Sequence, residues 1–414
     1  MQRVYQLNDR KFTPNDEDFQ KILAYAYANQ LRPVCGCSRL KPVTLYVAKI
    51  TNRAAYELRR MPNAGSRHAS GCAHYEPPLG LSGLAQVQGH AILENEQSEQ
   101  IELKLDFALT RVSGRAPPTP KDTVADTVKS DGTKLTLRGL LHYLWHTAQL
   151  DRWYPAMEGK RGYATMFKYV SNAAMGKITK SQSLADKLYI PEPHHPERED
   201  EIRRRRMLRM AQLGNNSGGT TKLGLLIGEL YELRPAQFGH HAIFKGAMDC
   251  PFRVNDDLYA RMLKHFEAAL SMWDQFLDET HLILIGTFTV DASGTPSLQE
   301  VAVMNVEKNW IPFESIYEKT LITELIAQKR VFWKCLRFNL PKSAPMANAV
   351  LTDTAASATA LCILPAGASE ESEDTLKKHV DSSDMQLWFW RSGEQELPSL
   401  PSVAHSSTTT KDHQ

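Results

Sequence analysis

The chain has 414 residues, of which 42% are hydrophobic and 23% are charged, and its formal net charge is +2. These values are ordinary for a globular protein with two or three cores, and the overall charge does not by itself demand a nucleic-acid partner. No stretch approaches the about 18 consecutive apolar residues of a membrane span, and the N-terminus has no apolar signal-peptide core. Six cysteines in such a chain indicate reduced thiols and a cytoplasmic protein.

Three cysteines and a histidine lie close together near the N-terminus: Cys35, Cys37, His68 and Cys72. Three sulfurs and an imidazole are a ligand set that structural zinc prefers, and the glycine between the first two cysteines permits a tight turn. Residues 43–50 and 55–60 read as a β-hairpin between the two pairs. The layout predicts a zinc-ribbon-like site with His68 or His74 as the fourth ligand. The alternative is a group of buried thiols without metal.

A half-buried strand is predicted for residues 101–110, which alternate apolar and polar side chains. Its expected partner is 87–93, joined through a polar turn at 95–98. Residues 1–112 are therefore predicted to form a β domain, and the Pro-rich segment 113–134 is predicted to be a linker.

The next segment, 135–222, is predicted to be helical and basic, with helices at 135–150 and 163–175. Lys160 and Arg161 begin a run with few acids nearby, and such helical pairs can bind phosphates. The alternative is the solvated face of a small helical bundle. His142 and His146 lie one helical turn apart, but without the glutamate of a zincin motif they are interpreted as structural.

The densest positive patch of the sequence lies in a predicted helix at 197–210. Acids one turn before the arginines favour ion pairs along this helix, so phosphate contact is the second interpretation. The candidate phosphate-binding arginines are Arg203, Arg204, Arg205 and Arg206.

An α+β domain is predicted for residues 223–313, with strands at 223–233, 242–244, 281–290 and 299–306 and a helix at 256–277. The preceding segment 214–222 is glycine-rich, but its lysine stands two positions too late for a phosphate-binding loop, so a turn is expected.

The segment 314–392 has a regular order of predicted elements. A helix at 317–328 is followed by strands at 332–340, 349–354 and 358–364, a helix at 371–380 and a strand at 385–390. This order resembles the α/β core of the PD-(D/E)xK (restriction-endonuclease-like) nuclease superfamily. The resemblance implies a Mg²⁺ site with Asp353 as its first acid.

The third strand of that segment departs from the nuclease pattern, because it carries neither the second acid nor the lysine. We therefore expect a nuclease-like scaffold without activity. The alternatives are an active nuclease that recruits acids from 370–373 and an unrelated α/β domain with the same element order. Residues 393–414 are polar and are predicted to form a disordered tail.

Three segments, 58–78, 351–354 and 397–401, are similar to an uncharacterised family carried on proteobacterial plasmids and integrative elements. Members of that family carry an acid near position 361, where this chain has Leu361 and Cys362. A cysteine cluster followed by a nuclease-like fold is also similar to a bacterial competence protein family that handles incoming DNA.

The sequence thus predicts an α+β multidomain, cytoplasmic, nucleic-acid-binding protein of a mobile element, with structural zinc and an inactive nuclease-like domain. Other proteins of the element are expected partners, and no membrane association is expected. Two alternatives remain: an active Mg²⁺-dependent nuclease, and an assembly component that binds proteins and no nucleic acid.

Overall fold

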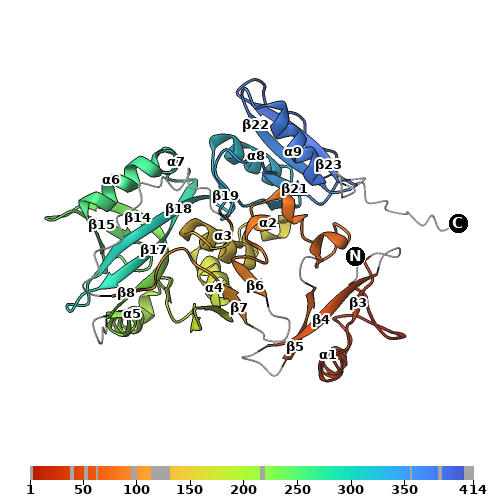
Figure 1. The fold of residues 1–414 in the computed structure, drawn as a ribbon, viewed down its shortest axis with the longest axis horizontal. Coiled ribbons are helices and arrows are strands. Elements are labelled where there is room, and N and C mark those ends of the chain that lie inside the picture. Colours follow the sequence, from red (N-terminus) through yellow and green to blue (C-terminus); the bar gives the residue numbers. More distant parts are fainter. Residues whose placement is uncertain are drawn as a thin grey trace. The chain divides into compact units, whose positions relative to one another are not determined.

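The computed structural model describes residues 3–37, 42–50, 55–61, 64–94, 100–112, 131–214, 220–354, 357–380 and 385–404. The chain forms two compact units, and each mixes helices and strands (Figure 1). The first unit comprises Met1–Leu81, Val331–Trp333 and Ala349–Gln414, and the second comprises Ser82–Arg330 and Lys334–Asn348. No helix among the described residues is long and apolar enough to cross a bilayer.

The N-terminal part of the first unit is an antiparallel sheet covered by one helix. Its strands, in the order β2-β1-β3-β4-β5, are β1 (Tyr5–Leu7), β2 (Arg10–Phe12), β3 (Val34–Cys35), β4 (Val43–Ile50) and β5 (Ala55–Arg60). Helix α1 (Phe19–Ala28) buries Ile22, Leu23 and Ala26 in one apolar cluster with Leu45 and Val47 of β4. The β4–β5 hairpin has the bounds predicted from its sequence.

The C-terminal part of the first unit is a second sheet. Its strands include β20 (Phe332–Lys334), β21 (Ala349–Leu351), β22 (Thr359–Pro365) and β23 (Gln386–Ser392). Strands β21 and β22 are antiparallel, whereas β22 and β23 are parallel and are connected through helix α9 (Glu370–Val380). The predicted order of elements is present, although α8 (Ile316–Ala327) belongs to the second unit.

Two predicted features of this C-terminal region differ in the structure. The strand expected at 332–340 ends at Lys334, because Phe338 takes a left-handed conformation (φ 48°) and Arg337 holds the Pro341 and Ala344 carbonyls in a turn. Residues 393–404, expected to begin a disordered tail, are bonded to the sheet; for example, the indole of Trp388 donates to the Ser399 carbonyl. The rest of that tail, 405–414, lies outside the described residues.

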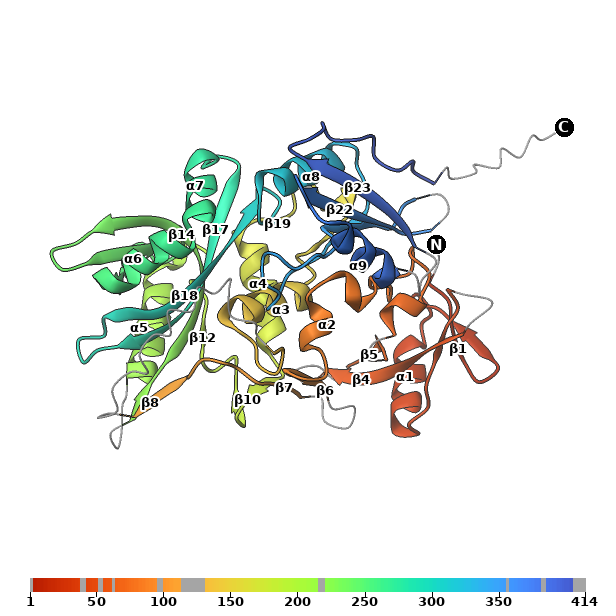
Figure 2. The same ribbon diagram turned by 45° about the horizontal axis from the view of Figure 1, so that its top comes forward.

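The larger sheet of the second unit supplies its main core. Its strands are β12 (Leu188–Tyr189), β14 (Gly224–Pro235), β15 (His240–Phe244), β16 (Phe252–Val254), β17 (Thr280–Val290), β18 (Pro296–Glu307) and β19 (Pro312–Phe313). Helices α6 (Asp256–His265) and α7 (Glu267–Gln275) pack along it (Figures 1 and 2). They replace the single helix predicted at 256–277, because Phe266 leaves the helical conformation and packs against the core.

The remaining part of the second unit contains α2 (Leu84–Val87), α3 (Leu137–Thr147), α4 (Tyr163–Ala174), α5 (Glu199–Gly214) and the short strand β9 (Arg152–Trp153). A small sheet runs β11 (Gln182–Ser183), β10 (Lys177–Thr179), β7 (Ile101–Leu103), β6 (Ile92–Glu94), and β8 (Thr110–Val112) pairs with β13 (Thr220–Lys222).

The strand predicted at 101–110 is shorter than expected. Buried side chains continue to alternate with exposed ones through Leu105 and Phe107. Beyond β7, however, the backbone forms hydrogen bonds with Leu135, which belongs to no strand. Its partner β6 is shorter than the predicted 87–93 because Leu84–Val87 is helical. The turn at 95–98, most of the linker 113–134 and the glycine-rich residues 215–219 lie outside the described residues.

Candidate metal centre

The first pair of candidate ligands lies where β3 enters a turn. Cys35 is on the central strand of the N-terminal sheet, opposite Tyr5 on one side and Val43 on the other, and is 4% exposed. The Gly36 amide donates to the Val4 carbonyl at 3.0 Å, and a Cβ on this glycine would lie 2.9 Å from that oxygen. Glycine is therefore required here by a close backbone approach, and it lets Cys37 turn back toward Cys35.

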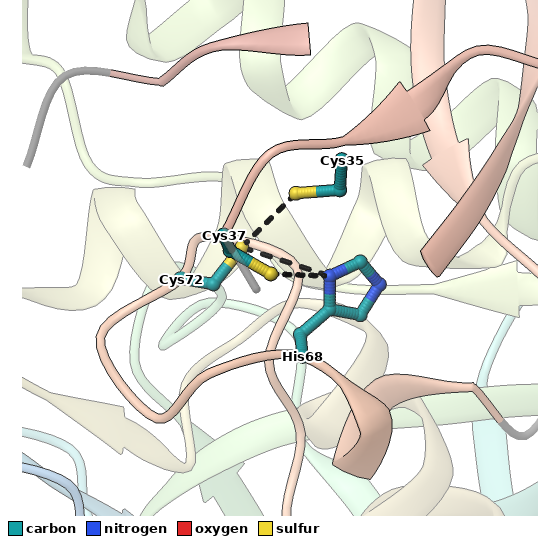
Figure 3. A group of neighbouring side chains, drawn as sticks. All are labelled: Cys35, Cys37, His68 and Cys72. Carbon is teal, nitrogen blue, oxygen red and sulfur yellow. Dashed lines mark hydrogen bonds between the residues drawn. The ribbon is translucent and has the colours of Figure 1, made fainter. Parts of the chain in front are cut away.

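The second pair follows the short 3₁₀ helix Gly65–Arg67. His68 takes an extended conformation directly after it and is 4% exposed. The Cys72 amide donates to the Ala69 carbonyl at 2.8 Å, which closes a turn between the two ligands. This turn directs the Cys72 thiol toward Cys35 and the His68 ring (Figure 3).

The four side chains converge on one point. One ligand atom from each of Cys35, Cys37, His68 and Cys72 lies within 4.8 Å of all the others. The contacts are 3.6 Å between the Cys35 and Cys72 sulfurs, 3.3 Å from the Cys37 sulfur to His68 Nδ1, and 3.8 Å from the Cys72 sulfur to the same nitrogen. Tetrahedral zinc, with about 2.3 Å to sulfur and about 2.0 Å to nitrogen, requires ligand separations of roughly 3.5–3.8 Å. The group can hold a metal ion of this size.

The His68 ring presents one of its nitrogens to the sulfurs. Its Nδ1 faces the sulfurs of Cys37 and Cys72, while its buried Nε2 has no hydrogen-bond partner among the described residues. A metal ion on Nδ1 would fix the neutral tautomer that carries its proton on Nε2. Nδ1 is therefore the atom that His68 can offer to a metal.

The thiols influence each other's protonation. A hydrogen bond with Cys35 lowers the pKa of Cys72 to about 3, with help from His68 and from the His74 amide, 3.4 Å from the sulfur. The same hydrogen bond raises the pKa of Cys35, and burial raises that of Cys37. The hydrogen bond between Cys35 and Cys72 thus favours the thiolate form of one sulfur of the pair, which is the form that binds metal.

His74, the alternative fourth ligand, lies outside the group. Its Nε2 is 3.0 Å from the Tyr5 hydroxyl, and its ring packs against the ring of His68. Burial lowers the pKa of His74 to about 4. His74 therefore packs beside the His68 ring in its neutral form, and the structure places His68, not His74, in the group that could hold a metal ion.

Asp353, the predicted nuclease acid, is in a different environment. Its carboxylate accepts the Val331 amide at 2.8 Å, and its carbonyl accepts the Ala404 amide. Among the described residues, the Cys/His cluster is the only group of three or more His, Cys, Asp or Glu with converging ligand atoms. Asp353 thus connects backbone segments of the C-terminal sheet, and in the described part of the chain no group of three such residues converges around it.

Two of the predicted phosphate-binding residues lie just before α4. The Arg161 guanidinium donates to the carbonyls of Leu150 and Arg152, and burial lowers its pKa to about 10. The hydrogen bonds of the Arg161 guanidinium are therefore made to the backbone of the second unit. Lys160 is exposed and makes no ion pair within the described part of the chain.

The four arginines of α5 are mostly ion-paired. Arg203 and Arg206 both contact Asp249, and Arg205 contacts Glu192 at 2.6 Å. Arg206 is also 8% exposed. Arg204 is exposed, without an ion pair in the described segments. The structure does not bring these arginines together as one free positive surface.

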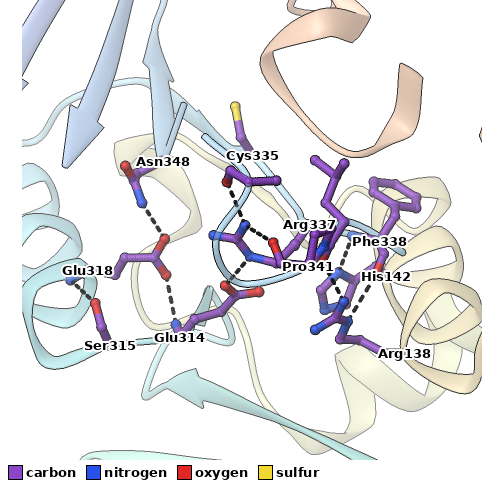
Figure 4. A network of polar contacts seen from close by, with 12 residues as sticks. Arg138, His142, Glu314, Ser315, Glu318, Cys335, Arg337, Phe338, Pro341 and Asn348 are labelled. Atoms are coloured by element: carbon purple, nitrogen blue, oxygen red, sulfur yellow. Dashed lines mark hydrogen bonds and ion pairs between the residues drawn. The ribbon is translucent and has the colours of Figure 1, made fainter. Parts of the chain in front are cut away.

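A cluster of charged side chains that sequence reasoning missed lies inside the second unit (Figure 4). Glu318 of α8 accepts from Lys334 at 3.0 Å and from Asn348 at 2.6 Å, and both charged groups are 4% exposed. The Glu314 side chain is 33% exposed, and the positive charge of Arg337 and its neighbours lowers the pKa of its carboxyl. Each of these charges has a partner, so the cluster is structural.

The two helical histidines likewise have separate structural partners. His142 Nδ1 accepts the Phe338 amide at 2.9 Å, and burial lowers the pKa of this imidazole to about 3. His146 Nδ1 is 2.6 Å from Asp151. Each of these two imidazoles thus contacts a different group within the second unit.

The family of the chain follows from comparison with known families. A family model described as "Protein of unknown function (DUF1173)" matches residues 5–393. The chain belongs to this family. The prediction of an uncharacterised family covering most of the chain is thereby confirmed, and the DUF1173 match includes all four candidate metal ligands. Comparison with curated proteins and with solved structures gave no match.

Proposed function

We propose that this DUF1173 protein binds nucleic acid through its N-terminal segment, and that a structural zinc ion on Cys35, Cys37, His68 and Cys72 stabilises that segment. The observation that carries the proposal is the distribution of charge. Residues 1–81 contain twelve Lys and Arg and six Asp and Glu, a net charge of +6. The remaining residues contain 37 and 41, a net charge of −4. A local basic excess is the electrostatic signature of phosphate binding.

Some of the basic residues in this segment are available to contact phosphates. Arg10, Arg59 and Arg60 form ion pairs with carboxylates of the same segment. Five other basic residues are exposed and make no ion pair within the described residues: Arg3, Lys11, Lys21, Lys49 and Arg67. Residues 349–414 of the same unit carry ten acids and four bases, so phosphate contact is assigned to the N-terminal segment alone.

Zinc is the metal that best fits three sulfurs and one imidazole at these separations, because thiolates select soft or borderline ions. With four protein ligands its coordination is complete, so it supplies cross-linking and no open position for a substrate. Cys37 and Cys72 pack against the apolar cluster that also contains α1, so a metal on these sulfurs joins the turns to the sheet and to that helix.

The proposal retains the finer sequence predictions. The N-terminal sheet is a zinc-ribbon-like module, and the C-terminal sheet is a nuclease-like scaffold without activity. The backbone role of Asp353 and the lack of converging acids around it among the described residues support this view. We place the protein in the cytoplasm, acting on the nucleic acid of a mobile element together with other proteins of that element.

The test is fluorescence anisotropy of the zinc-loaded full chain with labelled single- and double-stranded DNA, titrated with salt. Lys21→Gln/Lys49→Gln should weaken binding and reduce the salt slope by about 1.4 on single strands, because each phosphate contact contributes about 0.7. Lys160→Gln/Arg204→Gln removes the same charge from the second unit and should leave binding near wild type.

The remaining outcomes separate the alternatives. Equal losses in the two double variants would show that binding follows overall charge and would overturn the N-terminal assignment. Magnesium-dependent cleavage that Asp353→Ala abolishes would establish the active nuclease. No salt-sensitive binding to either form of DNA would favour the assembly component.

A further inference from the structure

We infer that Tyr25 on one flank of α1, and Tyr27 with Tyr56 of β5 on the other flank, form a two-part stacking surface for the bases of single-stranded nucleic acid, with Lys21 and Lys49 as phosphate contacts. The inference rests on the proposed function and specifies the form of nucleic acid and the residues that bind it. All five residues belong to the N-terminal part of the first unit, where α1 lies beside β4 and β5 (Figure 1).

The first observation is the exposure of aromatic rings on a short helix. Tyr25 is 58% exposed and Tyr27 is 41% exposed, although α1 has a separate buried face of Ile22, Leu23 and Ala26. The two tyrosines therefore do not serve the core that orients the helix. Exposed aromatic side chains in a basic segment are typical of surfaces that bind single strands.

The second observation is that one ring is held in place. Tyr27 packs on Tyr56 with 5.2 Å between ring centroids and 48° between planes. Gln20, two turns before Tyr27, bonds both backbone groups of Tyr56, accepting from its amide at 2.9 Å and donating to its carbonyl at 3.0 Å. A ring whose support is fixed in this way loses little conformational entropy when a base stacks on it.

The third observation is that each tyrosine group has a lysine beside it. Lys49 is the cross-strand partner of Tyr56 in the β4–β5 ladder, and Lys21 precedes Tyr25 by one helical turn. Both lysines are exposed. The neighbouring acids Asp18 and Glu57 are each in an ion pair with an arginine. Lysines next to exposed rings can contact the phosphates that flank a stacked base.

The chemistry selects single strands. In a duplex the base faces are covered by neighbouring base pairs, so tyrosine rings can stack only on bases that are unpaired. Every base has a π face on which a ring can stack, and a lysine recognises only the negative charge of a phosphate. We therefore expect binding with little preference for base sequence or for the sugar.

The experiment uses the zinc-loaded full chain and fluorescein-labelled oligothymidylate in an anisotropy titration. Tyr25→Ala and Tyr27→Ala should each weaken binding by about 5-fold or more, since one stacked base contributes about 1–3 kcal/mol. Tyr25→Phe and Tyr27→Phe should bind like wild type because they keep the ring. Alanine is the best helix former, so these variants should keep α1, and circular dichroism and zinc content check this.

The matched control is Tyr231→Ala, which removes a ring that is 52% exposed in the second unit. It should bind like wild type, and an oligouridylate of the same length should bind like the DNA probe. If wild type binds oligothymidylate but both tyrosine variants match Tyr231→Ala, the stacking surface is wrong while the proposed function stands. If wild type binds duplex more tightly than single strands, the single-strand assignment is overturned. If it binds neither, the proposed function itself fails.

Discussion

Replacement of Cys72 by serine should release the metal and unfold the N-terminal segment. Cys72 contacts both Cys35 and His68, so this change removes a residue with two contacts inside the group. The apolar cluster beneath it is small, with Phe12, Leu23 and Leu45 among its most buried side chains. A core of this size rarely contributes more than about 3–5 kcal/mol.

The magnitude follows from mass action. At a zinc concentration about 1,000-fold above the dissociation constant, the ion adds about 4 kcal/mol to stability, which is comparable to the core itself. Loss of that amount from a segment of this size lowers its melting temperature by roughly 15–30 °C. Mass spectrometry should find one zinc per wild-type chain and close to none in Cys72→Ser, and calorimetry should show a separate unfolding transition at lower temperature.

The control is Cys250→Ser, the same chemical change at a half-buried cysteine of the second unit. This variant should bind as much zinc as wild type, and its N-terminal segment should unfold at the wild-type temperature. Equal zinc content and equal melting in Cys72→Ser and Cys250→Ser would refute the metal site, and with it the zinc-ribbon interpretation.

Three further predictions concern stability and metal affinity. The buried imidazole of His142 has its pKa lowered to about 3, whereas the unfolded value is about 6.5. The unfolded chain therefore binds a proton that the folded chain excludes, so the free energy of unfolding should fall as pH drops from about 6.5 to about 3, by up to about 1.4 kcal/mol per pH unit from this group. Urea unfolding at several pH values checks this, and an unchanged slope in His142→Gln would contradict it. Glu318→Gln leaves its buried lysine partner with an uncompensated charge and should cost about 3–5 kcal/mol in denaturant unfolding, against less than about 1 kcal/mol for Glu324→Gln on the same helix. Gly36→Ala places a methyl group 2.9 Å from a carbonyl oxygen and should lower zinc affinity in a chelator competition, whereas Gly71→Ala, with open space around it, should not.

Local patterns predicted the parts of the fold that depend on local interactions. The β4–β5 hairpin has the predicted bounds because its side chains alternate and its pairing is between adjacent strands. Helix α5 was predicted because acids precede arginines by one turn. The Cys/His cluster was predicted because its four residues fall within 38 residues, a spacing that core packing explains poorly.

Features that depend on residues far apart in the sequence could not be predicted from local patterns. Ion pairs along α5 were predicted, and Arg205 does pair with Glu201 one turn before it. The further pairs of Arg205 with Glu192 and of Arg203 with Asp249 could not be predicted, because these acids lie outside the helix. The sequence could not decide between His68 and His74 as the fourth candidate ligand. His74 is held by the Tyr5 hydroxyl, which belongs to the first strand and is distant in the sequence. The basic excess of residues 1–81 was available from the sequence, but the net charge of +2 for the whole chain conceals it.

The central claim is that the zinc-bearing N-terminal segment makes the contacts with nucleic acid. Photo-crosslinking locates these contacts directly: the full chain is irradiated with a bromodeoxyuridine oligonucleotide, and the crosslinked peptides are identified by mass spectrometry. Crosslinks should concentrate in peptides of α1 and the β4–β5 hairpin, and should be lost when zinc is removed with a chelator. Crosslinks confined to α5 or to α9 and β23, or unaffected by zinc removal, would contradict the account.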